Sequence, residues 1–389
     1  MSFGVSKLGI LAEIRTGKLD SNAAIENGEY PFFTCDPTTL RIDKYAFDQE
    51  AVLLAGNNAN ANYTTKYYSG KFNAYQRTYV IKSNDETVLL TRFLAFALAQ
   101  SLAKLKSLSI GTSTKYLTKG ILDNLEIPLP TLCEQRKIID TLSTYESLIE
   151  NNREQIKLLE EAAQRLYKEW FVDFRFPGHE TVEIDFETGL PKEWAVKNLL
   201  AEISFVRGKS YTAENLSRES GQQLINLSNI APFGGWMPGG EKPYSGDCRP
   251  DQIVSSGDVL LAVTDMTKER RLVGHASMIP RKLAGSVISM DLIKLVPNNL
   301  ERSYLYCWLR FSGISSMISM LANGTNVLHL KPEALNRVSI LVPCLSMQKA
   351  FSHVVSPIFT MMDCLQEQIE ELLEARDRLV PRLMEGNND

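Results

Sequence analysis

The sequence predicts an α+β protein made of two pseudo-repeated mixed α/β domains, separated by two long helices that can pair with each other as a coiled coil. Three observations predict this class: an internal duplication, a heptad pattern in each copy, and short apolar runs broken by turn residues. At 389 residues the chain also exceeds the usual size of a single core. We expect domains at 1–130 and 191–343, helices at 131–171 and 344–384, a linker at 172–190 and a tail at 385–389.

The duplication keeps one offset of 213 residues from the end of each domain through each helix. Gly111 pairs with Gly324, and the register holds without a gap to Leu166 and Leu379. Upstream the copies agree only in outline, with LAEI and VLLA in both and a drifting offset between them. A shared frame with different loops predicts two related tasks on two different targets.

Each helical segment carries apolar residues at alternating steps of four and three, which is a coiled-coil seam. The first seam comprises Ile138, Leu142, Tyr145, Ile149, Asn152, Ile156, Leu159, Ala163, Leu166 and Trp170. The second comprises Phe351, Val355, Ile358, Met362, Leu365, Ile369, Leu372, Arg376, Leu379 and Leu383. Asn152 and Arg376 either fix the register, lie at the seam edge or bind a partner. Each helix would be about 55–60 Å long. A whole domain separates the helices, so no short turn sets their direction of pairing; antiparallel pairing would make a spacer with one domain at each end.

Further features mark the helix start and the helix surface. Thr131 to Glu134 matches a capping box, whereas Cys344 and Met347 in the second copy do not, so the second cap must differ. Apolar residues off the seam leave room for a partner protein, although a solvated surface is the alternative; they are Ile139, Leu148, Leu158, Met361, Leu373 and Val380.

Short apolar runs such as AVLLA, TYVIK, VLLAV and MDLIKL indicate an antiparallel type of sheet in each domain. A helical stretch follows in each copy, at 91–105 and at 302–321. The domains are therefore mixed, with strands and helices around one core each.

Charge indicates where nucleic acid would bind. The net charge of −4 argues against it, but the acid is concentrated in 131–180 and 344–389, and the rest is slightly basic. In the first domain, 62–81 has six aromatic residues, three cations and no acid. We expect Tyr79, Val80 and Ile81 to form a core strand, and the part before them to be an exposed loop that contacts phosphates and bases; the alternative is that the segment supplies only the core strand. The matching segment of the second domain, 264–282, is also basic and follows the same VLLA run.

The candidate DNA-binding residues come from these two segments, from the polar turns that begin at Gly111 and Gly324, and from the stretch just after the AVLLA run, which contains Asn58. In the first domain they are Asn58, Lys66, Lys71, Arg77, Thr112, Ser113 and Lys115. In the second they are Lys268, Arg270, Arg271, His275, Thr325 and Asn326. The alternative for the polar turns is a role in turn formation alone.

The sequence has no motif of a nucleotide-binding loop, a zinc protease, a serine hydrolase or an adenine methyltransferase. Its six scattered cysteines form no CxxC pair, so we expect reduced thiols, no metal and no cofactor. No apolar run long enough to span a membrane and no secretory signal is present, which predicts a cytoplasmic protein.

Several segments together resemble the specificity subunit of type I restriction-modification enzymes. They are IPLPTLCEQRKIIDTL, QRLYKEWFVDFRFPG, LPKEWAVKNLLAEI, the two Gly-Thr turns and LLEARDRLVPRLMEG. The resemblance implies a non-catalytic subunit whose two target-recognition domains read the halves of a split site in double-stranded DNA. It also implies that the two long helices pack as an antiparallel coiled coil. It implies two modification (methyltransferase) subunits and further restriction (endonuclease and translocase) subunits as partners, which would hold the methyl donor and ATP. Met347-Gln348 departs from the Glu134-Gln135 pair of the first helix.

Two other classes of function remain open at this stage. A duplicated coiled-coil adaptor with protein-binding ends would show little dependence of binding on salt, unlike a DNA-binding protein. A self-contained methylase or nuclease would need the catalytic motifs that the sequence lacks.

Overall fold

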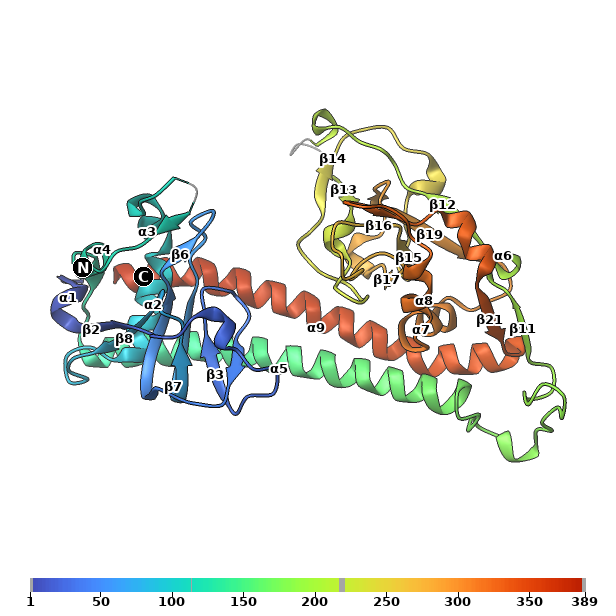
Figure 1. Cartoon of the computed structure of the whole chain (residues 1–389), viewed down its shortest axis with the longest axis horizontal. Coiled ribbons are helices and arrows are strands. Elements are labelled where there is room, and N and C mark those ends of the chain that lie inside the picture. The colour runs from blue at the N-terminus through green and yellow to red at the C-terminus, as the bar shows by residue number, and fades with distance from the viewer. Residues whose placement is uncertain (1–2, 113, 217–220, 387–389) are drawn as a thin grey trace. The chain divides into compact units, whose positions relative to one another are not determined.

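The computed structural model describes residues 3–112, 114–216 and 221–386. The chain forms two compact units, Met1–Asn151 with Gln368–Asp389, and Asn152–Glu367. Each unit holds a globular domain and a segment of both long helices, α5 (Leu132–Phe171) and α9 (Leu345–Glu385) (Figure 1). The prediction of a mixed α/β protein with two long helices is confirmed at this level.

The first unit is built on a six-stranded sheet of order β2-β8-β5-β7-β3-β4. Its strands are β2 (Ala12–Thr16), β3 (Tyr30–Phe33), β4 (Leu40–Ile42), β5 (Phe47–Ala55), β7 (Thr65–Ala74) and β8 (Thr78–Ser83). All neighbours are antiparallel except β3 and β7, which are parallel. Two short antiparallel pairs join β1 (Val5–Lys7) to β10 (Glu126–Pro128) and β6 (Asn57–Asn58) to β9 (Lys115–Tyr116).

Side chains along β5 alternate between the two faces of this sheet, and those on both faces are buried. Val52 and Leu54 belong to the main core with α2 (Thr91–Gln100), whereas Leu53 faces a smaller cluster around Phe72. The remaining helices of the unit are α1 (Leu8–Leu11), α3 (Leu102–Leu108) and α4 (Lys119–Asp123). Ile138 of α5 and Met384 of α9 complete the main core, so both long helices pack on this domain.

The second unit contains an antiparallel sheet of order β12-β19-β15-β17 and a three-stranded sheet of order β14-β13-β18. The strands of the first are β12 (Ile203–Arg207), β15 (Val259–Ala262), β17 (Ala276–Met278) and β19 (Leu292–Pro297). Those of the second are β13 (Gln222–Ile225), β14 (Lys242–Tyr244) and β18 (Val287–Ile288), with β13 and β18 parallel. Two further pairs are β11 (Ala195–Asn198) with β21 (Ser339–Val342), and β16 (Thr264–Asp265) with β20 (Leu328–His329).

The main core of the second unit joins the sheet to helices α6 (Leu199–Glu202), α7 (Arg302–Phe311) and α8 (Ile314–Met320). Both long helices add aromatic side chains to it. The rings of Trp170 in α5 and Phe351 in α9 lie 5.6 Å apart, and Phe171 lies 4.9 Å from Phe351. The end of α5 therefore packs against the start of α9 within this unit.

The predicted seam residues of both helices are all buried or half-buried, including Asn152 at 7% exposure. Off the seam the outcome is mixed. Ile139 and Val380 pack on the core of the first unit, whereas Leu148, Leu158 and Met361 are exposed.

Two buried glutamines tie the long helices to their domains in the same way. The Gln135 amide donates to the Pro130 carbonyl at 2.9 Å and accepts from the Leu90 N–H at 2.8 Å. The Gln348 amide donates to the Pro343 carbonyl at 2.8 Å and accepts from the Glu301 N–H at 3.0 Å. Each glutamine thus fixes the first turn of its long helix beside the start of α2 or α7.

The predicted capping box of α5 is present. The Thr131 N–H donates to the Glu134 carboxylate at 2.8 Å, and the Glu134 N–H donates to the Thr131 hydroxyl at 3.4 Å. At the start of α9 the Cys344 thiol and the Ser346 hydroxyl lie 3.3 Å apart, so the second cap differs, as predicted.

Candidate nucleic-acid interface

In each unit a short β pair brings the Gly-Thr turn beside the segment that follows the VLLA strand. In the first unit Asn58 pairs with Lys115, and the Leu117 N–H donates to the Gly56 carbonyl at 2.8 Å. In the second unit Asp265 pairs with Leu328, and the Leu330 N–H donates to the Val263 carbonyl at 2.8 Å. The two polar segments of each domain are therefore neighbours.

The glycines of these turns are required by the backbone. Gly111 has φ +107° and Gly324 has φ +144°, values that side chains rarely tolerate. A Cβ at Gly111 would also lie 2.2 Å from the Thr114 carbonyl oxygen, and one at Gly324 would lie 1.9 Å from that of Val327. Thr112, Thr325 and Asn326 follow these glycines and are exposed, while Ser113 lies outside the described residues.

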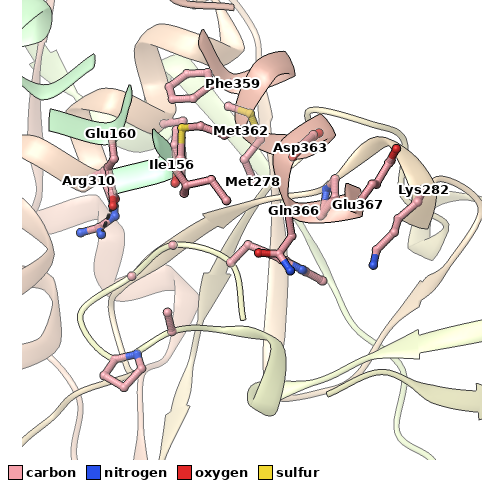
Figure 2. A pocket seen from close by; sticks show the side chains of 17 residues that line it. Ile156, Glu160, Met278, Lys282, Arg310, Phe359, Met362, Asp363, Gln366 and Glu367 are labelled. Atoms are coloured by element: carbon pink, nitrogen blue, oxygen red, sulfur yellow. Dashed lines mark hydrogen bonds and ion pairs between the residues drawn. The ribbon is translucent and has the colours of Figure 1, made fainter. Parts of the chain in front are cut away.

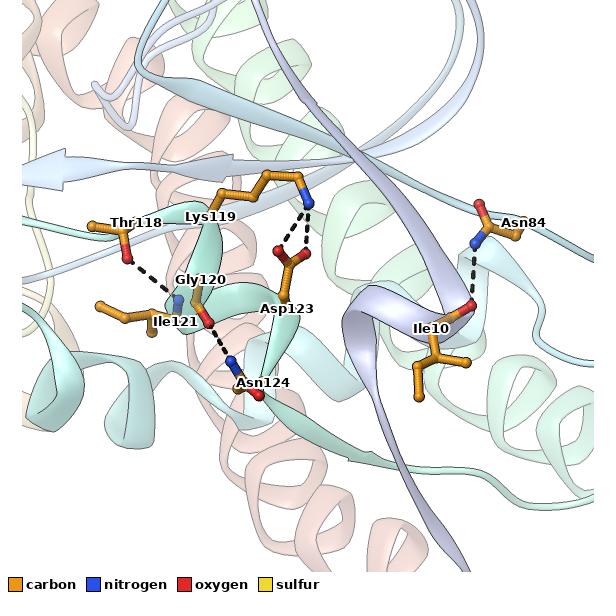
Figure 3. Close-up of polar contacts among 8 residues, drawn as sticks. All are labelled: Ile10, Asn84, Thr118, Lys119, Gly120, Ile121, Asp123 and Asn124. Carbon is orange, nitrogen blue, oxygen red and sulfur yellow. Dashed lines mark hydrogen bonds and ion pairs between the residues drawn. The ribbon is translucent and has the colours of Figure 1, made fainter.

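Helix α4 fixes the chain just beyond the first turn (Figure 3). The Ile121 N–H donates to the Thr118 hydroxyl at 3.3 Å, and Lys119 pairs with Asp123 at 2.7 Å. On the neighbouring α1, the Asn84 amide donates to the Ile10 carbonyl at 3.2 Å. These contacts hold the frame around β9, and Lys115 on β9 is half-buried.

The prediction that 62–78 is an exposed loop is wrong, because Thr65–Ala74 forms strand β7. This strand pairs with β5 from Phe47 and Phe72 to Leu54 and Thr65. The six aromatic side chains of 62–81 are all buried or half-buried. All of them except Tyr75 belong to the core clusters of the domain or pack against them. The strand expected at 79–81 is present as part of β8, whereas neither interpretation of the sequence predicted β7.

The cations of this segment differ in what their head groups contact. Lys66 donates to the Asp36 carbonyl and the Thr39 hydroxyl, and burial lowers the pKa of its amine. Lys71 is exposed, with its ammonium 4.8 Å from the centre of the Tyr45 ring. Arg77 is exposed in the turn between β7 and β8. Lys71 and Arg77 are thus the accessible cations of this segment.

The Asn58 side chain has a structural role that the sequence did not suggest. Its carbonyl oxygen accepts from the N–H groups of Asn60 at 2.9 Å and Asn62 at 3.1 Å. Such an Asx turn holds the loop between β6 and β7. The pattern Asn-x-Asn after the VLLA strand is the signal that could have revealed this role.

In the second unit the buried Asp265 carboxylate organises the loop from β16 to β17. It accepts from the Thr267 N–H at 2.7 Å, the Thr267 hydroxyl at 2.7 Å, and the N–H groups of Leu272 at 2.6 Å and Val273 at 3.1 Å. Although burial opposes ionisation, these hydrogen bonds lower the pKa of Asp265. These hydrogen bonds therefore fix the conformation of the loop.

Of the four candidate cations on this loop, two are accessible. Lys268 and Arg271 are exposed. Arg270 instead donates to the carbonyls of Ser319 and Ala322, the latter at 3.2 Å, which ties the loop to the end of α8. His275 is 6% exposed, and burial followed by the charge of Arg310 lowers its pKa. Because His275 is buried, its ring has no face open to DNA, and it is no longer a candidate DNA-binding residue. Arg270 anchors the loop to the end of α8.

A cavity of about 310 Å³ lies in the second unit, where the domain packs on α5 and α9 (Figure 2). Ile156, Met278 and Phe359 form an apolar part of its wall. The charged side chains around it are paired within the protein: Arg310 contacts Glu160 at 2.6 Å and Glu367 contacts Arg281 at 3.2 Å. We therefore interpret the cavity as a space left where the domain packs on the two long helices.

Within the described ranges, no cluster of His, Cys, Asp and Glu could hold a metal ion. None of the described helices combines the length and hydropathy of a membrane span.

Comparison with known proteins gives a consistent answer. Residues 2–161 match the family described as type I restriction modification DNA specificity domain. The EcoDI specificity subunit of Escherichia coli is 25% identical to this chain, covering 97% of it and 86% of the relative. The MjaIX specificity subunit of Methanocaldococcus jannaschii is 28% identical over 72% of this chain and 65% of its own length. The first part of the chain thus matches the specificity-domain family, and nearly the whole chain is similar to a specificity subunit of a type I restriction-modification enzyme.

A solved specificity subunit shares the fold of this one. The crystal structure of the S subunit from M. genitalium aligns with a TM-score of 0.64, covering 98% of this chain and 96% of that chain at 16% identity. At this identity the likeness concerns the fold alone.

Proposed function

We propose that this specificity subunit recognises a split DNA sequence, with one half read by each domain. The observation that carries the proposal is the repeated arrangement of the loop and the Gly-Thr turn. In both units an Asx turn and a glycine turn are joined by a two-residue β pair, and the polar residues they present differ. A constant frame with different side chains suits the reading of two different sequences.

The chemistry of the accessible residues fits double-stranded DNA. Lys71, Arg77, Lys268 and Arg271 are exposed cations that can neutralise phosphates. Thr112, Thr325 and Asn326 offer hydroxyl and amide groups that can bond to base edges or to the backbone. We retain Lys66, Asn58 and Lys115 as candidates of second rank, because their side chains are half-buried or already bonded.

The subunit is a recognition component and not an enzyme. We propose that it positions two modification subunits and further restriction subunits, to which the methyl donor and ATP would belong, and that it acts in the cytoplasm where the DNA is.

We propose further that α5 and α9 form an antiparallel coiled coil, with domains at 1–130 and 191–343. Contacts of the α5 start with the α9 end in one unit, and of the α5 end with the α9 start in the other, support this pairing. A helical spacer of constant length would fix the gap between half-sites, on the order of one turn of DNA.

The test combines partner capture with DNA binding. The tagged full-length chain is purified from its native host, its partners are identified by mass spectrometry, and its affinity for genomic DNA fragments is measured at about 50 and about 200 mM salt. A methyltransferase subunit together with sequence-specific, strongly salt-dependent binding supports the proposal. Unrelated partners and no DNA binding would instead favour the duplicated coiled-coil adaptor.

A further inference from the structure

The loop that follows β16 presents a large apolar side chain to solvent at its first residue, Met266. Met266 is 75% exposed, although it directly follows Asp265, which is fully buried. Lys268 and Arg271, both exposed, lie on the same loop. An exposed apolar side chain thus lies on the same loop as two exposed cations and one exposed acid, Glu269, in a segment that the proposed function assigns to DNA.

The backbone around Met266 is held on both sides. Asp265 binds the N–H groups of Thr267, Leu272 and Val273, which closes the loop on itself. Arg270 has φ +53° and is tied by its side chain to the carbonyl of Ala322. Because these hydrogen bonds already order the loop, binding a ligand at Met266 would cost little further conformational entropy.

The first domain has the same turn with a different residue directly after the short strand. Asn58 accepts the N–H of Asn60 as Asp265 accepts that of Thr267, and both residues lie at equivalent positions of the two short β pairs. The residue that follows is Ala59 in one loop and Met266 in the other, and both are exposed. The frame therefore does not require a large apolar side chain at this place.

We propose that Met266 makes an apolar contact with the bases of the half-site read by the second domain, an inference that rests on the proposed function. Methionine is unbranched and polarisable, so it adapts to an irregular surface such as a base step or a thymine methyl group. Apolar side chains contact thymine methyls in the major groove and wedge between bases in the minor groove. The neighbouring cations would bring the phosphates close, and Met266 would add sequence dependence.

The test uses the full-length chain with Met266→Ala, Met266→Leu and the control Met361→Ala. Met361 is 53% exposed on α9 and lies outside the loop. Affinity for the specific duplex should fall about tenfold in Met266→Ala, stay near wild type in Met266→Leu, and be unchanged in Met361→Ala. The salt dependence should be the same in all four proteins, because no phosphate contact is removed.

Two DNA substitutions then locate the contact. Replacing thymine by uracil in the second half-site should weaken wild type but not Met266→Ala if the methyl group is touched. If Met266 separates a base step instead, 2-aminopurine at that step should brighten with wild type and not with the variant. An unchanged affinity in Met266→Ala, or no response of either probe, overturns this inference. The proposed function would survive that result, because it depends on the binding of the wild-type chain itself.

Discussion

Asp265 and Asn58 stand at the same place in the two loops, but only Asp265 is ionised. A carboxylate can accept more hydrogen bonds than an amide oxygen, and Asp265 accepts four where Asn58 accepts two. The longer loop of the second domain is thus organised by a buried charge. Because hydrogen bonds lower its pKa, Asp265 also links stability to pH.

We expect Asp265→Asn to lower the free energy of unfolding by about 2 kcal/mol at pH 7. The carboxylate contributes stability above its ordinary pKa of 3.8, and this contribution is lost as pH falls through the lower pKa of the folded state. The free energy of unfolding, measured with denaturant from pH 7 to pH 3, should therefore differ less between wild type and variant below about pH 4. If the difference in free energy of unfolding stays constant across this range, the Asp265 charge is not the source of the stability.

His275 illustrates how the fold decides the role of a titratable residue. The ring is buried with Phe233 at 5.7 Å, and its pKa is lowered, so it is neutral near pH 7. We expect DNA affinity to change equally with pH between about 6 and 8 in wild type and in His275→Gln. If wild type alone bound DNA more tightly at pH 6, a protonated His275 would be contacting phosphate after all.

At the scale of elements, strand β7 shows why a segment expected to be an exposed loop forms a strand. Its residues lack the clean alternation of a half-buried strand, and its cations suggested a surface loop. Pairing with β5 along one edge and with β3 along the other buries Phe72 and half-buries Tyr67 and Tyr68. This outcome depends on partners distant in the sequence.

The buried glutamines give the element scale its own prediction. Gln135→Ala should lower the free energy of unfolding by about 2–4 kcal/mol, because the Leu90 N–H and the carbonyls of Val88 and Pro130 lose their partner. Chemical denaturation measures this loss. The exposed Gln100→Ala is the control and should stay within about 0.5 kcal/mol of wild type. If both variants lost the same free energy of unfolding, Gln135 would not anchor the start of α5.

At the scale of the molecule, the two domains should act on separate halves of the target. We expect Arg77→Ala to weaken contacts with one half-site and Arg271→Ala with the other, each by about tenfold in affinity, while capture of partner subunits is unchanged. Binding to duplexes randomised in one half at a time separates the two effects. Loss of discrimination at the same half in both variants, or unchanged affinity in both, would refute this division.

The sequence by itself determined the duplication, the two long helices, the capping box at Thr131 and the mixed α/β class. These features rest on local periodicity and on a repeated order of residues, which need no knowledge of distant contacts. The tertiary structure alone decided which candidate side chains are open to a ligand. It buried His275, anchored Arg270 on α8, placed Lys66 on a strand and left Lys268, Arg271 and Met266 exposed. Exposure is set by elements that meet only in the folded chain, and so the spacing of residues along the sequence does not encode it.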